Sequence, residues 1–252
     1  MGIIIKSDTE IAAMRKAGII VANILQKISE RVRPGVKTKE FDIIAETELE
    51  MRRATSSFKG YHGFPASICV SVNDEIVHGI PGEKTLYEGD IVSLDFGAIY
   101  EGFQGDAAIT VPVGKISPTA QRLIDTTQEA LEKGIAAARA GATLGDISAA
   151  IQKHAESKNY SVVREYTGHG IGRNMHEDPQ IPNYGIAGTG PELKKGMTLA
   201  LEPMLNTGGS STRVAKDRWT VLTADGSLSA HFEHTIAISD DEPEVLTRVV
   251  DG

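Results

Sequence analysis

The chain has 252 residues, 40% of them hydrophobic and 24% charged, which is enough to bury a substantial core as a soluble globular protein. Its 26 basic and 34 acidic residues give a formal charge of −8, which argues against a dedicated DNA- or RNA-binding surface. The single cysteine, Cys69, excludes an intrachain disulfide, and no apolar run approaches a membrane span or a signal-peptide core, so we expect a cytoplasmic protein.

Two helices are predicted before the first long strands. Ser7-Asp8-Thr9-Glu10 has the pattern of a capping box, and apolar residues then recur at helical spacing as far as Ile28. This helix should end by Pro34-Gly35, and Thr38 is expected to cap the second helix. The short strands predicted after these helices cover residues 67–72 and 75–78.

The stretch Ile91–Val113 reads as two strands joined by a tight turn, and each strand carries an aspartate. If Tyr100 and Glu101 form the turn, Asp95 and Asp106 face each other directly. Opposed Cβ atoms lie about 4.5–5.5 Å apart, where like charges repel. Either the two carboxyls share a proton or a cation, or one of them points to solvent or into the loop, and the hairpin alone leaves both open.

Two more helices and several strands are predicted after the hairpin. Ser117-Pro118 marks a helix start, with Ser as the cap and Pro at the first helical position, and this helix runs to about Arg139. Thr143 and Asp146 open another helix that ends near Lys158. The remaining predictions are strands over residues 162–166, 198–205 and 231–239 and a Gly- and Pro-rich loop over residues 167–196.

A faint internal repeat relates the two parts of the chain. Two short motifs recur 106 residues later, and each pair opens a helix. We therefore expect a single domain over residues 1–252 built from two related α/β halves, roughly 1–115 and 116–252. The motif pairs are Arg33-Pro34-Gly35 with Arg139-Ala140-Gly141, and Glu40-Phe41 with Asp146-Ile147.

Acids and a histidine mark three further positions after the hairpin. His169 stands between glycines in Thr167–Gly172, whose alternating glycines never form a dinucleotide fingerprint. Glu202 ends one apolar strand before a proline, and Glu233 enters another. Taken singly, these residues could be an incidental loop histidine and two edge-strand charges. Burying an unpaired carboxylate is very costly, however, so acids that end apolar strands favour a neutralising partner.

Together these positions form an oxygen-rich set without a thiolate, which suits harder divalent ions and not structural zinc. One divalent cation would leave two of the four negative charges buried, whereas two cations would give neutrality. Two metals that share bridging carboxylates sit about 3.5–4 Å apart and equip a site for hydrolysis. The set is Asp95, Asp106, His169, Glu202 and Glu233.

The order of these residues resembles that of the methionine aminopeptidases, in their short bacterial type I form. The resemblance covers almost the whole chain, which has no N-terminal zinc-binding extension and no room between Glu202 and Glu233 for the helical insert of type II. The matching motifs are Gly60-Tyr61-His62-Gly63-Phe64-Pro65, Asn73 through Pro81, Leu94-Asp95-Phe96-Gly97, Gly168–Gly172, His176-Glu177-Asp178-Pro179 and Leu201-Glu202-Pro203.

This resemblance implies a fold, an activity and partners. The fold would be the pseudo-two-fold pita-bread α/β fold, with a curved antiparallel sheet and two helix pairs on its outer face. The activity would be removal of the initiator methionine from nascent chains whose second residue is small. Such an enzyme would work as a cytoplasmic monomer near the ribosome, with two divalent ions (Co, Mn, Fe or Zn) and with neither DNA nor a membrane as partner.

The resemblance also implies a role for each member of the set. Asp95 would chelate one metal, Asp106 and Glu233 would bridge both, and His169 and Glu202 would complete the shell of the second. A bridging water would attack the methionine carbonyl carbon, and Glu202 would also move the proton.

Two further histidines and an apolar pocket would complete the site. His176 would stabilise the oxygen of the tetrahedral intermediate. His78 would contact the scissile amide nitrogen or the next residue. Three other histidines are expected to be surface or hydrogen-bonded residues without a role in the site: His62, His154 and His234. The methionine pocket would be lined by Phe58, Tyr61, Phe64, Cys69, Met175 and Trp219.

The chain departs from its relatives within this pocket. Met175 stands where relatives often have an aromatic residue, Phe64 where they have tyrosine, and Phe58 near a position often held by cysteine. These differences concern the strictness of methionine selection. Two alternatives use the same fold: a proline-directed peptidase, which usually carries a separate N-terminal domain, and a non-enzymatic binding protein, whose hallmark is a broken ligand set.

Overall fold

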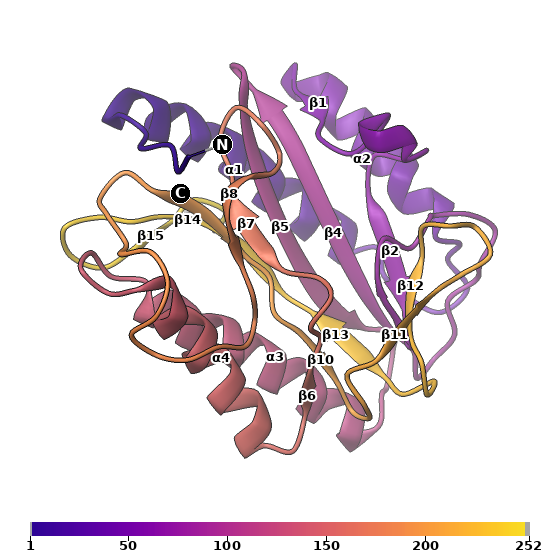
Figure 1. Cartoon of the computed structure of the whole chain (residues 1–252). Coiled ribbons are helices and arrows are strands. Elements are labelled where there is room, and N and C mark those ends of the chain that lie inside the picture. Colours follow the sequence, from indigo (N-terminus) through magenta and orange to yellow (C-terminus); the bar gives the residue numbers. More distant parts are fainter. Residues whose placement is uncertain (1, 250–252) are drawn as a thin grey trace.

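The computed structural model describes residues 2–249 as a central antiparallel sheet with four long helices packed against it (Figure 1). Helices α1 and α2 form one pair, and α3 and α4 form the other. The fold predicted from the sequence is confirmed in its central antiparallel sheet and its four helices. The expected division into halves at about residue 115 falls between β5 and α3 and stays a prediction. The helices are α1 (Asp8–Ser29), α2 (Lys39–Arg52), α3 (Pro118–Ala137) and α4 (Leu144–Ser157), with a short 3-10 helix at Tyr61–Gly63.

The main sheet has nine strands, and its path runs β1-β4-β5-β14-β9-β7-β8, with β2 beside β4 and β15 beside β14. Strands far apart in sequence therefore become neighbours at its centre. Its members are β1 (Thr55–Ser56), β2 (Cys69–Val72), β4 (Ile91–Tyr100), β5 (Phe103–Pro112), β7 (Gly168–Gly170), β8 (Glu177–Ile181), β9 (Thr198–Leu201), β14 (Glu233–Ala237) and β15 (Glu244–Val245).

Two three-stranded sheets adjoin the main sheet. One has the order β13-β10-β6 and the other the order β11-β12-β3. Their strands are β3 (Glu75–Val77), β6 (Ser161–Val162), β10 (Met204–Asn206), β11 (Thr212–Val214), β12 (Val221–Thr223) and β13 (Ser229–His231).

Three helix starts follow local capping chemistry. Ser7 and Glu10 form the predicted capping box of α1, and Ser117 accepts a hydrogen bond from a backbone N–H of α3. The carboxylate of Asp146 accepts from the backbone N–H of Thr143 at 2.7 Å at the start of α4. Thr38 occupies the N-cap position of α2 as predicted, but its side chain forms no capping hydrogen bond. Its hydroxyl accepts instead from the N–H of Gly82 at 2.9 Å and ties the helix to a distant loop.

The hairpin of β4 and β5 is confirmed, but its predicted register is wrong. Gly97 pairs with Asp106, and Asp95 pairs with Ala108, so the turn residues are Glu101 and Gly102. Both turn residues have positive φ (51° and 78°), which is the geometry of a type I′ turn that matches strand twist. The two aspartates are therefore diagonal neighbours. The error amounts to two positions, so both still lie on the same face of the sheet.

The two long strands predicted late in the chain are each interrupted. The expected strand 198–205 breaks at Glu202-Pro203 into β9 and β10, and 231–239 breaks at Phe232 into β13 and β14. Strands β9 and β14 pair in the main sheet, whereas β10 and β13 pair in a small one. Proline cannot donate to a ladder, so the chain changes sheets there. Glu202 and Glu233 consequently lie at the junction of two sheets.

Two other predictions in this region need correction. The expected strand 162–166 is limited to β6, and the expected loop 167–196 contains β7 and β8. The loop prediction failed because the glycines of β7 have no side-chain pattern that marks a strand. Separately, none of the helices within residues 2–249 is long and apolar enough to cross a membrane.

The hydrophobic core is divided between the two helix pairs. One cluster lies between α1, α2 and the strands β2 and β4, and another lies between α3, α4 and the strands β9 and β14. Helix α1 packs on β4 and β5, and α3 packs on β14 and its neighbours. The four helices therefore cover one face of the main sheet, and the polar side chains of its central strands project from the opposite face.

Candidate metal centre and active site

The five predicted ligands come from adjacent strands and from one strand end. Asp95, Ala108 and Glu233 form a row across β4, β5 and β14. Glu202 directly follows β9, and Asn183 Nδ2 donates to its backbone carbonyl at 3.0 Å. Ala108 is small, so the flanking carboxylates have room to turn toward each other over it.

A second row lies one step further along the same strands. His169, Ala200 and Thr235 are consecutive cross-strand partners on β7, β9 and β14. The Thr235 hydroxyl donates to the backbone carbonyl of Asp106 at 2.8 Å, which brings β5 into the row. Residues two apart on a strand share a face, so Asp106 and His169 project on the same side as the first row.

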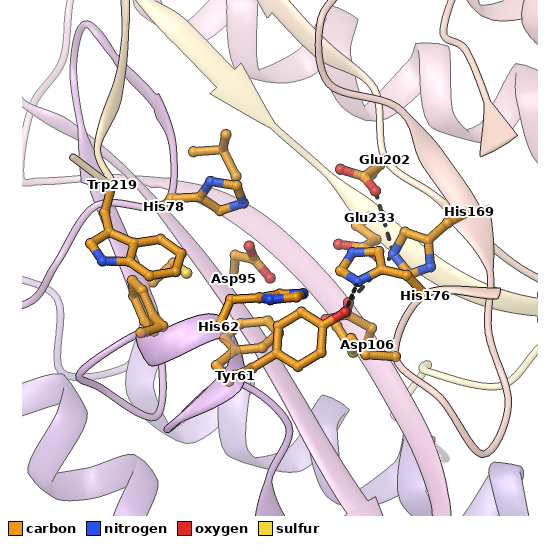
Figure 2. Close-up of a pocket in the computed structure, with 15 residues that line it drawn as sticks. Tyr61, His62, His78, Asp95, Asp106, His169, His176, Glu202, Trp219 and Glu233 are labelled. Atoms are coloured by element: carbon orange, nitrogen blue, oxygen red, sulfur yellow. Dashed lines mark hydrogen bonds and ion pairs between the residues drawn. The ribbon is translucent and has the colours of Figure 1, made fainter. Parts of the chain in front are cut away.

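The side chains of both rows converge on one space (Figure 2). His169 Nε2 lies 3.6 Å from Glu202 Oε1 and 4.0 Å from Asp106 Oδ2. Asp106, His169 and Glu233 each offer one donor atom, and these atoms all lie within 4.8 Å of one another. Asp95 and Glu202 line the same cavity. The structure thus brings together every residue of the predicted set.

The flanking glycines fix the position of His169. A Cβ on Gly168 would lie 2.4 Å from the carbonyl oxygen of Ala200, and one on Gly170 would lie 2.2 Å from that of Asp178. Only glycine allows the neighbouring strands to approach β7 this closely. His169 Nδ1 donates to the Gly170 carbonyl at 2.9 Å, which leaves the Nε2 lone pair facing the carboxylates. Histidines that bind metals are oriented in this way.

The carboxylates are buried without positive partners. Burial, followed by neighbouring carboxylates, raises the pKa values of Asp95, Glu202 and Glu233 well above their usual range, and burial raises the pKa of Asp106 to about 7. Within residues 2–249, three buried carboxylate oxygens have no hydrogen-bond partner: Asp95 Oδ1, Asp106 Oδ1 and Glu233 Oε1. Hard oxygen donors and one imidazole nitrogen that lack counter-charges fit divalent cations.

An apolar pocket opens directly beside this cluster. One cavity of about 210 Å³ is lined by the four acids and the histidine described above together with all six predicted pocket residues. The Phe64 and Trp219 rings meet edge to face with centroids 5.2 Å apart, and Phe58 contacts Phe64 in the same manner. Burial raises the pKa of the Cys69 thiol well above its usual value, so Cys69 contributes as an uncharged sulfur.

Both predicted helper histidines reach the cavity. The Tyr61 hydroxyl lies 2.7 Å from His176 Nδ1, and the His176 ring is 4.3 Å from that of His169 between centroids. His78 has a positive φ of 61°, and a Cβ on the following Gly79 would lie 2.2 Å from the carbonyl oxygen of Val70. The backbone is therefore held in a sparsely populated conformation that directs His78 to the site, as is common at functional positions.

Comparison with known proteins identifies the family. Residues 12–240 match the model of a protein family described as "Metallopeptidase family M24". The chain belongs to metallopeptidase family M24. This agrees with the resemblance drawn from the sequence motifs, and all five predicted ligand residues are present in this M24 member.

Relatives of similar length carry the name methionine aminopeptidase. "Methionine aminopeptidase 1" of Bacillus subtilis is 51% identical over 247 residues, covering 98% of this chain and 100% of the relative. "Methionine aminopeptidase" of Clostridium acetobutylicum is 52% identical, covering 97% and 98%. The crystal structure of methionine aminopeptidase from Thermotoga maritima matches with a TM-score of 0.97 and 47% identity, covering 98% of this chain and 100% of that one.

A proline-directed M24 peptidase is more distant. The Xaa-Pro dipeptidase from Bacillus anthracis matches with a TM-score of 0.78 and 27% identity, and the match covers 98% of this chain but only 63% of that one. The additional length of that chain agrees with the expectation that proline-directed relatives carry a further domain.

Sequence reasoning missed residues of this M24 site. His62, which was assigned no role, lines the cavity, and so does Val77. His231 lies buried next to two of the acids. The Gly-Tyr-His-Gly-Phe-Pro motif was a usable signal for His62. Nothing in the sequence marks His231, because its proximity to Glu202 depends on the sheet change at Pro203.

The electrostatics of the cluster predict how the stability of the metal-free protein depends on pH. Burial lowers the pKa of His169 and His231 to about 3 and that of His78 to about 4. Between pH 6.5 and 8 the unfolded histidines lose their remaining protons, which favours the folded state by only about 0.4 kcal/mol for each ring. The larger effect, of opposite sign, comes from the carboxyls. Their folded pKa values are raised, so the folded state binds protons that the unfolded state has lost.

The metal-free protein should therefore become less stable as the pH rises from 6.5 to 8, a range in which Asp106 ionises. Adding a divalent cation should remove this loss, because the cation neutralises the carboxylates and binds their ionised form. Thermal unfolding at both pH values, with chelator and with Mn(II), measures the effect. A metal-free protein that is more stable at pH 8 than at pH 6.5 would contradict the charge distribution described here.

Proposed function

We propose that this chain is a two-metal methionyl aminopeptidase that removes the N-terminal methionine from nascent proteins and peptides whose second residue is small. The observation that carries the proposal is the single cavity in which a hard-donor cluster adjoins an apolar pocket of aromatic and sulfur-containing residues. A thioether side chain suits such a pocket. The names of the relatives that match along the whole chain support the same activity.

The charge of the cluster favours two cations. The proposed ligand set holds four carboxylates and one imidazole, and two divalent ions neutralise the carboxylates whereas one does not. We assign Asp95 to one ion, Asp106 and Glu233 to both, and His169 and Glu202 to the other. Such ions, when bound, polarise a carbonyl and lower the pKa of a water molecule. The donors accept Co, Mn, Fe or Zn, so metal availability decides which ion is used.

The protein's own groups complete the chemistry. Glu202 stands at the edge of the cluster with 13% of its side chain exposed, where it can take the proton of the attacking water and pass it to the leaving amine. Burial lowers the pKa of His176, so its ring is neutral at pH 7. We assign the Tyr61 hydroxyl, 2.7 Å from Nδ1, as the donor to that nitrogen, which places the ring proton on Nε2 for donation to the substrate carbonyl oxygen.

His78 and the apolar wall fix the substrate. Burial keeps His78 neutral, and its ring lies 6.5 Å from that of Trp219 between centroids, so it stands where the pocket meets the remainder of the substrate. We assign it to the scissile amide nitrogen or the following residue. The six pocket residues hold the methionine side chain and exclude water from it.

The intact ligand set weighs against the binding-protein alternative, whose members lose such ligands. Methionine removal from nascent chains also sets the surroundings. We propose that the protein acts as a cytoplasmic monomer on N-termini that emerge near the ribosome. Its net charge of −8 is in keeping with a polypeptide substrate and not with DNA.

Purified protein supplied with Mn(II), Co(II) or Fe(II) should release methionine from Met-Gly and Met-Ala peptides. Release from Met-Lys peptides should be slower by a factor of roughly 100 or more, because a large second residue must displace side chains around His78. Chromatographic measurement of free methionine tests this, with chelator-treated protein as the control. Preferential cleavage of Xaa-Pro peptides would favour a proline-directed peptidase, and no release with any divalent metal would refute the enzymatic proposal.

A further inference from the structure

His231 is a buried histidine whose ring forms no hydrogen bond to the rest of residues 2–249. It ends β13 with 1% of its surface exposed, and within residues 2–249 neither Nδ1 nor Nε2 forms a hydrogen bond. Its backbone, in contrast, is held twice by Thr110, whose hydroxyl accepts from the His231 N–H at 2.9 Å and donates to its carbonyl at 2.8 Å. An imidazole that is fixed and buried in this way requires a polar partner to offset its desolvation.

The only charged groups that ion-pair geometry places beside this ring are two of the proposed ligands. Within the described part of the chain, His231 Nε2 lies 3.9 Å from Glu202 Oε2 and 3.8 Å from Glu233 Oε2. These distances exceed a direct hydrogen bond but suit a shared water or a small side-chain rotation. Both contacts use Oε2, whereas Glu202 Oε1 faces His169.

The His231 ring therefore lies nearest to Oε2 of each acid. Glu202 Oε1, which lies near His169, and Glu233 Oε1, which has no hydrogen-bond partner within residues 2–249, stay available to cations. A neutral imidazole has one N–H, and placing it on Nε2 gives the two carboxylates a donor that does not cancel their charge.

We propose that His231 is a positioning residue of the metal centre. Its Nε2 donates, directly or through one buried water, to Oε2 of Glu202 and Oε2 of Glu233. This rests on the proposed two-metal site but not on the substrate assigned to it. Groups that orient metal ligands typically change metal affinity about 10–100-fold when they are replaced. His231 should act on that affinity and not on methionine selection.

The test compares three substitutions by calorimetric titration of the metal-free full-length protein with Mn(II) alone. In His231→Gln the amide nitrogen lies as many bonds from Cα as Nε2 does, whereas in His231→Asn it is one bond shorter. His231→Leu keeps bulk without a donor. His154→Gln on the outer helix α4, where the ring contacts Glu129 at 3.0 Å, is the matched control.

We expect the Gln variant and the control to bind Mn(II) within about threefold of the parent, and the Asn and Leu variants to bind about 10–100-fold more weakly. Unchanged affinity in all variants overturns the proposal. A Gln variant as weak as the Leu variant also overturns it, since a donor at Nε2 would then not suffice. So does an Asn variant that binds like the parent. Because the readout is metal binding without peptide, failure of the aminopeptidase proposal would not affect it.

Discussion

Replacing Glu233 by glutamine should abolish both tight metal binding and activity. Glu233 is 2% exposed and stands at the end of its row, next to Ala108, and we assign its carboxylate to both proposed cations. A cation site supplies several kcal/mol at the transition state, so we expect kcat/KM to fall about 1,000-fold or more. The same change should make the metal-free protein more stable than the metal-free parent, because one of four mutually repelling buried carboxylates is gone.

These two effects have opposite signs, which separates loss of a ligand from general damage to the fold. Metal titration, peptide hydrolysis and thermal unfolding with and without Mn(II) measure them on the same sample. Glu129→Gln on the outer face, where the carboxylate is 57% exposed, is a matched control that should change none of them. Full activity in the Glu233→Gln variant, or an undiminished stabilisation by metal, would show that the ligand assignment is wrong.

Replacing His176 by alanine should lower kcat about 100- to 1,000-fold while leaving metal affinity and KM nearly unchanged. His176 lines the cavity and contacts the ring of His169 without being one of the proposed ligands, and its Nδ1 lies 2.7 Å from the Tyr61 hydroxyl. A donor that acts mainly on the charged oxygen of the tetrahedral state contributes to the chemical step and little to ground-state binding.

Tyr61→Phe provides the graded companion to this variant. It keeps the aromatic wall and removes only the hydroxyl that fixes the His176 ring, so a loss of about tenfold in kcat is expected. Steady-state kinetics on a Met-Ala peptide distinguish the outcomes. If His176→Ala instead raised KM with kcat intact, His176 would be a substrate-binding group and the oxyanion assignment would fail.

Much of the site was accessible from the sequence because its chemistry resides in residue types and local patterns. Four carboxylates and a glycine-flanked histidine in a chain without disulfides predict hard divalent cations, and the structure gathers all five. The starts of α1, α3 and α4 could also be predicted, because a capping side chain lies within three residues of the backbone group that it binds. Thr38 shows the limit, because its hydroxyl is engaged by Gly82, 44 residues away.

The hairpin shows which errors matter. The predicted turn was one residue off, which moved the pairing by two positions and left Asp95 and Asp106 on the same face. A glycine at the second turn position was the available signal, because a type I′ turn needs positive φ at both positions. The prediction that Asp95 and Asp106 are direct cross-strand partners was wrong, but the prediction that both line the same side of the site was right.

Other features depend on contacts that no local pattern records. The change of sheets at Glu202-Pro203 and Phe232 places two acids at a junction and brings His231 beside both. Pro203 was a usable sign of the first break, because proline cannot donate to a ladder, whereas nothing in residues 231–239 marks the break at Phe232. Which sheet each segment joins is determined by pairing with strands that are distant in the sequence.

The most direct test of the two-cation centre is anomalous diffraction from crystals of the full chain grown with Mn(II). The structure predicts two manganese peaks about 3.5–4 Å apart, both within reach of Asp106 and Glu233, with Asp95 beside one and His169 beside the other. A single peak at full occupancy in excess metal, or manganese bound away from these side chains, would contradict the account.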